Sequence, residues 1–431
     1  MSITISDVQN DTGSLQFVLA GSYEDGLDKS VPNAIRRTLL NDIPTVAFET
    51  DEDVDTKDLT MVTNHSSLHN EMLLHRVALV PLYLDPEEFK KHYLFECHVK
   101  HDKPEPFRFI TANDMNIYPL HKHLQERIDE LNDEGIQSEP TEERDLMEIL
   151  ETHSPDNYQM DKPLTQKDKD KVLRPFEFRG NKHYCLINEL KHTGTEGVHQ
   201  EVHYFGSPSV KTGALNSRYQ AVSQASYSFV KDDTLIQETL ENKMKLQDIP
   251  EEDKESFTRK FMLGESERYF KRDKHNEPNE YLFKIKSTHY WSSEELFRKA
   301  LDILMDACET LKAGYLLLLQ EKTSSVTVNQ VNDYSYIFTM NNQSHTLGSM
   351  LQSHLSRKCI EKDGLLLSAG YKKPHPLEES INLYVSLNPN HKLSKDTELH
   401  KLQGLVTFLM DQLDILRDMC KDIHELSGKA F

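Results

Sequence analysis

Ser2-Ile-Thr-Ile-Ser-Asp-Val8 and Ser325-Val-Thr-Val328 open two stretches of the chain that share one order of expected elements. In each stretch apolar and polar residues alternate, which is typical of a half-buried strand, and a second alternating segment follows. In the first stretch the turn is Asn10-Asp-Thr-Gly13, and in the later one Tyr336–Met340 is the second strand. The pattern predicts a β-hairpin at the start of each stretch.

Each expected hairpin is followed by an amphipathic helix. The first helix begins at Ser30 and Pro32, ends before Pro44, and directs Arg36 and Arg37 away from its apolar side. The second begins after Ser344. Their apolar positions are Val31, Ile35, Thr38 and Leu39, and Leu347, Met350, Leu351 and Leu355. The repeated order indicates two copies of one small α+β unit, although strand–turn–strand–helix is common enough to recur by chance.

A long helix is expected to close each copy, because apolar or small residues recur there at spacings of three and four. The leucines that mark these two stripes are Leu304, Leu311 and Leu318, and Leu402, Leu409 and Leu416. We expect the stripes to form a seam at which the two halves dimerise within one chain. The alternative is that each stripe lies on its own sheet. The connection over residues 321–325 is short, so the halves must lie side by side.

Length and charge limit the class of protein. The 431 residues are 28% charged and 37% hydrophobic, which favours a soluble globular protein of two or three domains. Apolar runs such as Ala78–Leu84 are far shorter than the ~18 residues that a membrane helix needs, and we expect neither a membrane span nor secretion. The 71 acidic residues outnumber the 50 basic ones, which argues against direct nucleic-acid binding. Five dispersed cysteines without a C-x-x-C pair favour a reducing compartment.

The character of the sequence changes between about residue 51 and residue 182, within the first copy. Tyr93–His101 and Phe107–Thr111 are typical of strands, whereas His121–Glu177 is acidic, polar and poor in apolar residues. A second polar stretch, Gln237–Arg272, is expected to be helical. We therefore predict a first module over residues 1–50 and 183–322, an inserted domain over 51–182 with a polar excursion, and a second module over 323–431.

Several residue patterns are similar to chemical sites. The loop Gly206–Thr212 lacks the second glycine of a phosphate-binding loop. Three groups have residue types that can ligate metal, and a solvated surface or core role is favoured for each. These groups are Asp51, Asp53 and Asp55; Cys97, His101, His121 and His123; and His69, Glu71 and His75. No catalytic residues are visible, and no cofactor is expected. The rival hypothesis is a stand-alone metal-dependent enzyme that uses the acidic or Cys/His groups of the inserted domain.

Two blocks in each half resemble subunits of one enzyme class. Val31-Pro-Asn-Ala-Ile-Arg-Arg-Thr-Leu-Leu-Asn-Asp-Ile-Pro44 and Asn64-His-Ser-Ser-Leu-His-Asn-Glu-Met-Leu-Leu-His-Arg-Val-Ala-Leu-Val-Pro-Leu82 resemble the third-largest subunit of eukaryotic RNA polymerase, archaeal D and bacterial α. His345-Thr-Leu-Gly-Ser-Met-Leu351 and Ala369-Gly-Tyr-Lys-Lys-Pro-His-Pro-Leu-Glu378 are similar to the eleventh polymerase II subunit and archaeal L. A fused pair resembles the arrangement in large cytoplasmic DNA viruses, including the asfarvirus and mimivirus groups.

The resemblance implies a fold and a role. The fold is α+β, with two RNA polymerase α-type dimerisation modules fused in one chain and the first interrupted by an inserted domain. The role is a non-catalytic assembly platform of a DNA-directed RNA polymerase, which docks the second-largest and the largest subunits for viral transcription. Small zinc-binding assembly subunits are further candidate partners, with no direct nucleic-acid or membrane contact. The implied location is the virion and the host cytoplasm, in the viral factory, with the nucleus as an alternative.

The resemblance also implies partner-binding positions. They are Asn33, Arg36, Arg37, Glu71, Arg76, His345, Thr346, Gly348, Tyr371, Lys372 and His375. An exposed Arg36–Arg37 pair would face the second-largest subunit, since guanidinium groups bind carboxylates in a bidentate way. Ser344 or Thr346 would cap the helix, and Gly348 would let another backbone approach. Each position in the second half could instead be purely structural.

Two departures from the family pattern affect these expectations. Many relatives hold a cysteine zinc cluster in the inserted domain, but only Cys97 falls there, so zinc is not carried over. The glycine-rich block before the last strand of the first module is altered to Thr193-Gly-Thr-Glu-Gly-Val-His199. In the family pattern this block is linked to the docking of small zinc-binding assembly subunits, so the alteration bears on that expected partnership.

Overall fold

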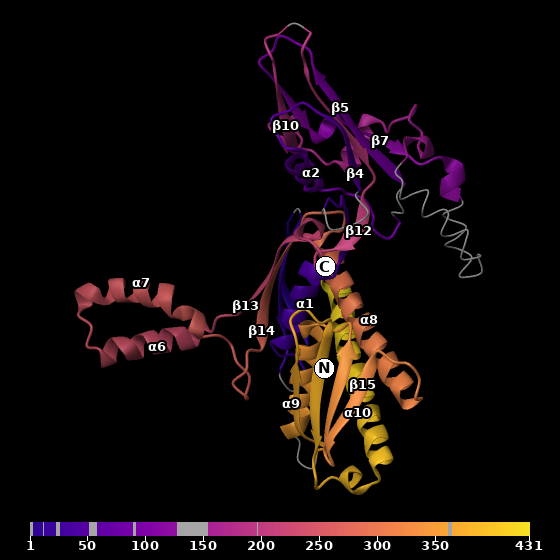
Figure 1. Ribbon diagram of the computed structural model, residues 1–431. Helices are drawn as coiled ribbons and strands as arrows, with labels where there is room; N and C mark the ends of the chain where they lie inside the picture. The colour runs from indigo at the N-terminus through magenta and orange to yellow at the C-terminus, as the bar shows by residue number, and fades with distance from the viewer. Residues whose placement is uncertain are drawn as a thin grey trace. The chain divides into compact units, whose positions relative to one another are not determined.

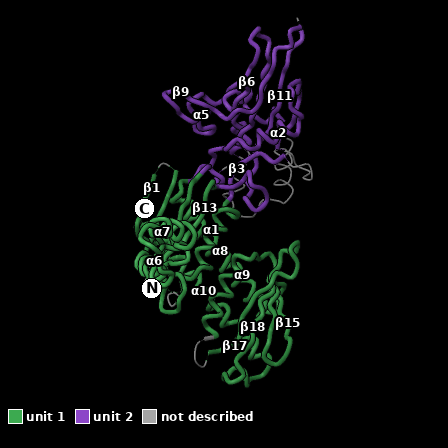
Figure 2. Tube along the Cα trace, turned by 90° about the vertical axis from the view of Figure 1, so that its left-hand side faces the viewer, with its two compact units in different colours: residues 1–43, 222–287, 292–431 green, residues 44–221, 288–291 purple. Residues whose placement is uncertain are grey.

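The computed structural model describes residues 3–11, 13–22, 26–50, 58–88, 92–126, 154–195, 197–360 and 364–431. Its contacts divide the chain into two compact units (Figure 2). Unit 1 comprises Met1–Ile43, Val222–Ser287 and Ser292–Phe431, and unit 2 comprises Pro44–Ala221 and Thr288–Trp291. No helix among the described residues is both long and apolar enough to span a membrane.

Unit 1 contains two four-stranded antiparallel sheets of the same topology. The first has the order β1-β2-β14-β13 and the second has the order β15-β16-β18-β17. The elements of the first module are β1 (Thr4–Asp11), β2 (Ser14–Ala20), α1 (Ser30–Asn41), β13 (Val222–Phe229), β14 (Glu280–Ser287) and α8 (Ser293–Leu319). Those of the second are β15 (Val326–Asn332), β16 (Ser335–Asn341), α9 (His345–Ile360), β17 (Leu366–Lys372), β18 (Ser380–Leu387) and α10 (Glu398–Ala430). The predicted repeat of one α+β module, with an interruption in the first copy, is therefore present (Figure 1).

The first helices of the two modules match residue by residue. Residues 31–41 of α1 and 347–357 of α9 have an identical order of buried and half-buried side chains. The same difference in residue number separates Gly26 from Asn342. These residues lie before α1 and α9, and both have positive φ, of 96° and 57°. Pro32 and Gly348 occupy equivalent positions, so the common design is carried by burial and backbone more than by residue identity.

The edge strands of both sheets are irregular in the same way. Each pairing between an edge strand and its inner neighbour contains a shift in register, and the additional residue lies in β1, β13, β15 or β17. The inner pairs β14–β2 and β16–β18 have no such shift. Bulges on edge strands disrupt the ladder that a foreign strand would extend, which keeps sheets from pairing edge to edge.

A helical hairpin interrupts the first module between β13 and β14, in the stretch expected to be helical. It consists of α6 (Asp233–Leu246) and α7 (Lys254–Gly264), and Figure 1 shows it extending from the ends of these strands. Ile236, Leu240 and Phe261 form a small core of its own. This core explains how a charged insertion can stay ordered.

The described part of unit 2 has one four-stranded sheet and three two-stranded ribbons. The sheet has the order β4-β11-β5-β7, and the ribbons are β10–β6, β12–β3 and β8–β9. The strands are β3 (Pro44–Ala47), β4 (Leu59–Asn64), β5 (Tyr93–His101), β6 (Phe107–Thr111), β7 (Met115–Pro119), β8 (Phe176–Phe178), β9 (Asn181–His183), β10 (Leu186–Lys191), β11 (Gln200–Gly206) and β12 (Ser209–Thr212). Among the residues of unit 2 that the structure describes, the α-helices are α2 (Asn70–Ala78) and α5 (Gln166–Val172). Short 3-10 helices in the two units are Ala112–Asp114, Pro155–Asn157, Ser217–Tyr219, Glu251–Asp253, Ser266–Arg268 and Lys392–Lys395.

The limits of unit 2 differ from the limits of 51 and 182 expected for the inserted domain. Strands β10, β11 and β12 each pair with strands of unit 2, so the unit continues to residue 221. The loop that resembled a phosphate site is the end of β11 together with β12. A Cβ on Gly206 would lie 1.9 Å from the carbonyl oxygen of Asp58, so this glycine permits the close approach of β4.

Candidate functional site: the joint between the two modules

The long helices α8 and α10 pack against each other within unit 1. Lys312 Nζ lies 2.6 Å from Asp414 Oδ2, and Arg417 Nη1 lies 3.6 Å from Glu309 Oε1. A third pair joins His424 Nε2 to Asp302 Oδ1 at 3.5 Å. From the first pair to the third, the residue numbers decrease along α8 and increase by the same amount along α10. The two helices therefore run antiparallel.

The six seam leucines are not equally buried in this packing. Leu304, Leu311, Leu409 and Leu416 are buried, whereas Leu318 and Leu402 are half-buried. The antiparallel register explains the difference, because Leu402 lies opposite no residue of α8 and Leu318 lies near the end of that helix. At the other end Phe431 closes the seam, with its ring centroid 5.9 Å from that of Phe297 in the first module.

The seam also contains two buried thiols, one on each helix. Burial raises the pKa of the Cys308 thiol to about 12 and raises that of Cys420 as well. Both groups are therefore neutral and serve as small apolar side chains.

The shorter helices α1 and α9 form the second half of the joint and are also antiparallel. Arg37 Nε on α1 donates to Thr346 Oγ1 at the start of α9, at 3.0 Å. At the opposite end, Asp28 before α1 accepts hydrogen bonds from Ser353 Oγ and from Arg357 Nη1, the latter at 3.1 Å. Asp28 is only 3% exposed, so its carboxylate is a buried charge held by both modules.

A buried polar chain leads from Asp28 to α10. Arg357 Nη2 donates to His354 Nδ1 at 3.0 Å, so the other ring nitrogen, Nε2, carries the proton and donates to Gln412 Oε1 at 3.0 Å. Burial, and then the neighbouring Arg357 charge, lower the pKa of His354 to about 4. His354 is therefore neutral at physiological pH and links three segments of the joint.

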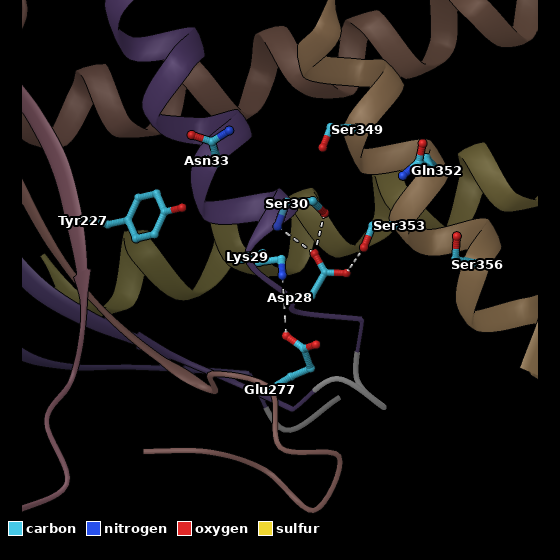
Figure 3. A pocket seen from close by; sticks show the side chains of 10 residues that line it. All are labelled: Asp28, Lys29, Ser30, Asn33, Tyr227, Glu277, Ser349, Gln352, Ser353 and Ser356. Carbon is cyan, nitrogen blue, oxygen red and sulfur yellow. Dashed lines mark hydrogen bonds and ion pairs between the residues drawn. The ribbon is translucent and has the colours of Figure 1, made fainter. Parts of the chain in front are cut away.

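A pocket of about 540 Å³ lies beside Asp28 and is lined mainly by hydroxyl, amide and charged groups (Figure 3). The first module contributes Asp28, Lys29, Ser30, Asn33, Tyr227 and Glu277, and the second contributes Ser349, Gln352, Ser353 and Ser356. Lys29 Nζ lies 3.9 Å from Glu277 Oε2 across the opening. This polar lining distinguishes the outer side of the joint from its apolar seam.

The arginine pair on α1 is half-buried rather than exposed. Arg36 donates from Nε and Nη2 to Asn33 Oδ1, at 3.1 and 2.9 Å, which fixes both side chains on the helix surface. The guanidinium group of Arg37 donates a hydrogen bond within the chain, to Thr346 on α9. The structure therefore differs from the expectation of an exposed arginine pair, because α9 lies against this side of α1 and Arg37 bonds to it.

The predicted residues of the second module gather at the start of α9. The Thr346 backbone N–H donates to Ser344 Oγ at 3.2 Å, as expected for a cap, and His345 Nδ1 is hydrogen-bonded to the Tyr371 hydroxyl at 3.2 Å. A Cβ on Gly348 would lie 2.7 Å from Cδ2 of Tyr371 and 2.9 Å from Cδ1 of Ile381. Gly348 thus admits two side chains of its own sheet, and not another backbone.

The remaining predicted residues lie outside this cluster. Lys372 ends β17 and is exposed, as is His375, whose Nδ1 accepts the Leu377 backbone N–H at 3.2 Å. Glu71 and Arg76 belong to α2 in unit 2. Arg76 donates to the carbonyl oxygens of Ile187 and Leu186, at 2.6 and 2.9 Å, which attaches α2 to β10.

The part of the chain that the structure describes contains no set of residues that could ligate a metal ion. There, no group of three or more His, Cys, Asp or Glu residues could hold a metal ion. Burial raises the pKa of Cys97 to about 12, and His101 Nε2 is hydrogen-bonded to the Glu105 carbonyl oxygen at 2.8 Å. Asp51, Asp53 and Asp55 lie outside the described residues.

Sequence reasoning missed the polar core of the joint. Asp28, His354, Arg357 and Gln412 were not singled out, because isolated polar residues near a helix normally indicate a solvated face. The one available signal was local: Asp28 stands two residues before Ser30, a spacing at which a carboxylate can accept the helix-start amide, and it does so at 2.7 Å.

Comparison with known proteins gives two family matches. The RNA polymerase Rpb3/Rpb11 dimerisation domain matches residues 23–308, and a second form of the same domain matches residues 335–426. Among similar proteins, the Dictyostelium discoideum DNA-directed RNA polymerases I and III subunit rpac1 is 31% identical over 110 residues, which cover 23% of this chain and 28% of that protein.

Two further relatives are an RPB11 subunit and another RPAC1 subunit. The probable DNA-directed RNA polymerase II subunit RPB11 of Caenorhabditis briggsae is 36% identical over 100 residues, or 23% of this chain and 74% of that protein. The human RPAC1 subunit of RNA polymerases I and III is 34% identical over 83 residues, or 19% and 20%. The chain thus matches most of the RPB11 relative but only about a quarter of the rpac1 proteins.

Proposed function

Because the chain belongs to the RNA polymerase Rpb3/Rpb11 dimerisation domain family, we propose that it is a non-catalytic assembly subunit of a multisubunit DNA-directed RNA polymerase. In this proposal each module replaces one member of a heterodimer, and the dimer forms within one polypeptide. The observation that carries the proposal is the joint itself: two modules of equal topology, with α8 antiparallel to α10 and α1 antiparallel to α9.

The proposed partners are the second-largest polymerase subunit and then the largest, with small zinc-binding subunits as further candidates. The outer side of the joint supports a docking role, because Arg36, Asn33 and the polar pocket beside Asp28 present donors and acceptors there. The proposed setting is viral transcription, in the virion and host cytoplasm or in the nucleus. Its support is the fusion of both modules in one chain.

Co-purification with the second-largest subunit of the same enzyme tests this function. Wild type is compared with Arg36→Ala, and with Arg259→Ala on the exposed side of α7 as a matched control for loss of one arginine. We expect wild type and Arg259→Ala to retain the partner and Arg36→Ala to retain less than about a tenth, since a central interface arginine can contribute 2 kcal/mol or more.

Two outcomes have distinct meanings. Retention by Arg36→Ala at the wild-type level would remove this residue from the interface. No association by wild type itself would end the proposal.

A further inference from the structure

Unit 2 carries an unusual set of exposed aromatic side chains. Among the described residues, every phenylalanine that is more than a third exposed lies in β6 or β8. The exposed fractions are 50% for Phe107, 54% for Phe109, 69% for Phe176 and 52% for Phe178. Single exposed apolar residues are normal, but four large ones on the β6–β10 ribbon and on the β8–β9 hairpin that directly precedes β10 indicate an interaction surface.

The β6–β10 ribbon directs two of these rings to its outer side. Ile110 pairs with Asn188, and both are buried, so this side of the ribbon faces the core of unit 2. Phe109 pairs with Glu189 on the opposite side, because side chains alternate along a strand. Leu186, at the end of β10, is 52% exposed.

The β8–β9 hairpin presents the other two rings. Its turn residues Arg179 and Gly180 both have positive φ, of 51° and 77°, as a tight two-residue hairpin turn requires. Phe176 and Phe178 lie on one face, with ring planes 14° apart and centroids separated by 6.4 Å. All residues of both strands are exposed. Strands of three residues form a marginally stable hairpin at best, so an additional covering surface would stabilise it.

The hairpin and the ribbon are continuous. Only Tyr184 and Cys185 separate β9 from β10, and the Ala112 backbone N–H at the end of β6 donates to the Cys185 carbonyl oxygen at 2.9 Å. Figure 2 shows β9 at the margin of unit 2, with α5 beside it. The Tyr184 hydroxyl donates to Asp170 Oδ1 on α5 at 2.6 Å, which anchors the base of the hairpin.

Two guanidinium groups at this surface have no carboxylate partner among the described residues. Arg179 lies over the Phe178 ring at 5.2 Å, and Arg174 lies over the Tyr83 ring at 4.3 Å. Lys182, by contrast, is paired with Asp170 at 2.6 Å. Within the described residues these arginines stack on aromatic rings and pair with no carboxylate, although the chain has a net charge of −21.

We propose that Phe107, Phe109, Phe176, Phe178 and Leu186, with Arg174 and Arg179, form a docking surface for an acidic, apolar segment of another polypeptide. Its apolar side chains would cover the rings, and its carboxylates would pair with the two guanidinium groups. Phenylalanine and arginine are among the residue types that are enriched in protein interfaces.

The other occupants fit the charges less well. A second copy of the chain would bring its own arginines against these. A nucleic acid would find the two arginines Arg174 and Arg179 on this surface, whereas phosphate binding needs clustered cations.

Fluorescence anisotropy with the full chain tests this surface without any polymerase subunit. The probe is a short labelled peptide in which glutamate and phenylalanine alternate. We expect it to bind wild type and to bind Phe176→Ser/Phe178→Ser and Arg174→Glu/Arg179→Glu at least about tenfold more weakly. Arg259→Glu on α7 is the charge-matched control and is expected to bind as wild type does. Hydrogen exchange on wild type should show residues 176–183 protected by the peptide.

The same anisotropy assay gives the results that would contradict the proposed docking surface. No binding of the acidic peptide to wild type, or equal binding by both double variants, would overturn the proposal. Equal binding of a lysine–phenylalanine peptide would disprove the charge selectivity, and preferential binding of labelled oligothymidylate would assign the surface to nucleic acid instead. Because the polymerase partners are absent, failure here leaves the assembly role untouched.

Discussion

At the scale of single residues, the joint depends on a buried charge that belongs to both modules. Asp28 accepts hydrogen bonds from Ser30, Ser353 and Arg357, so its carboxylate is satisfied only when α9 lies against the start of α1. Burying a carboxylate without partners is costly, so this residue ties the ordering of one module to the presence of the other.

Replacement of Arg357 by methionine should reveal this dependence. Arg357→Met leaves Asp28 buried without its cation, and we expect the free energy of unfolding to fall by about 3–5 kcal/mol. Asp28→Asn/Arg357→Met should be less damaging, since no charge remains buried. Urea unfolding followed by circular dichroism measures both. A single variant no less stable than the double one would show that Asp28 does not need this partner.

The neutral His354 makes stability depend on pH in a defined direction. Its pKa is lowered from 6.5 to about 4 in the folded chain, so below pH 6.5 the unfolded chain binds more protons than the folded chain. Above pH 6.5 this group therefore does not lower the free energy of unfolding. As the pH falls from 6.5 toward 4, the free energy of unfolding decreases by up to about 3 kcal/mol.

The measurement is urea unfolding at pH 7 and pH 4.5 for wild type, His354→Gln and His400→Gln. His400 is exposed on α10 and serves as the matched control. We expect His354→Gln to lose less stability than wild type between these pH values, and His400→Gln to behave as wild type. An identical loss in all three proteins would mean that His354 titrates normally.

At the scale of elements, the antiparallel pair α8–α10 provides the apolar part of the joint. Leu311 and Leu416 are each 1% exposed, whereas Leu316 on α8 is 46% exposed. The helix stripes were visible in the sequence because spacings of three and four are periodic and local. The register between the two helices could not be predicted from the sequence, because the ion pairs that define it join residues about a hundred positions apart.

Truncation of leucines on α8 and α10 should separate buried seam positions from an exposed position. We expect Leu311→Ala and Leu416→Ala to lower the free energy of unfolding by about 2–5 kcal/mol, because each leaves a cavity in the joint. Leu316→Ala should cost less than about 1 kcal/mol, since its side chain already contacts solvent. Chemical denaturation gives all three values. A harmless Leu416→Ala would mean that α10 does not bury its stripe against α8.

Much of the element pattern followed from the sequence, but long-range pairing did not. Tyr93–His101 and Phe107–Thr111 are strands with the expected bounds, and the two hairpins and long helices are present. Strands β10, β11 and β12 were expected in the first module and lie in unit 2, because strand alternation gives no information on the partner strand. Likewise, Arg37 looked solvent-facing because a helix pattern cannot show which neighbour covers its polar side.

At the scale of the whole molecule, the fusion makes module pairing intramolecular. Residues 320–325 alone connect α8 to β15, so the second module is always within reach of the first. A connection this short corresponds to an effective concentration of about a millimolar or more. The chain therefore needs no separate partner to complete the joint, and the bulged edge strands of both sheets limit pairing with other chains.

Intramolecular crosslinking tests this pairing most directly. Lys312 and Asp414 form an ion pair of 2.6 Å across the joint, so Lys312→Cys/Asp414→Cys in a chain without its native cysteines should react with a short bifunctional crosslinker. We expect a crosslinked peptide pair within a monomer of 50.0 kDa, and none for Lys312→Cys/Lys421→Cys, whose second site lies about 10 Å farther along α10. Crosslinks found only between two chains, or equal yields from both variants, would show that the modules do not pair within one polypeptide.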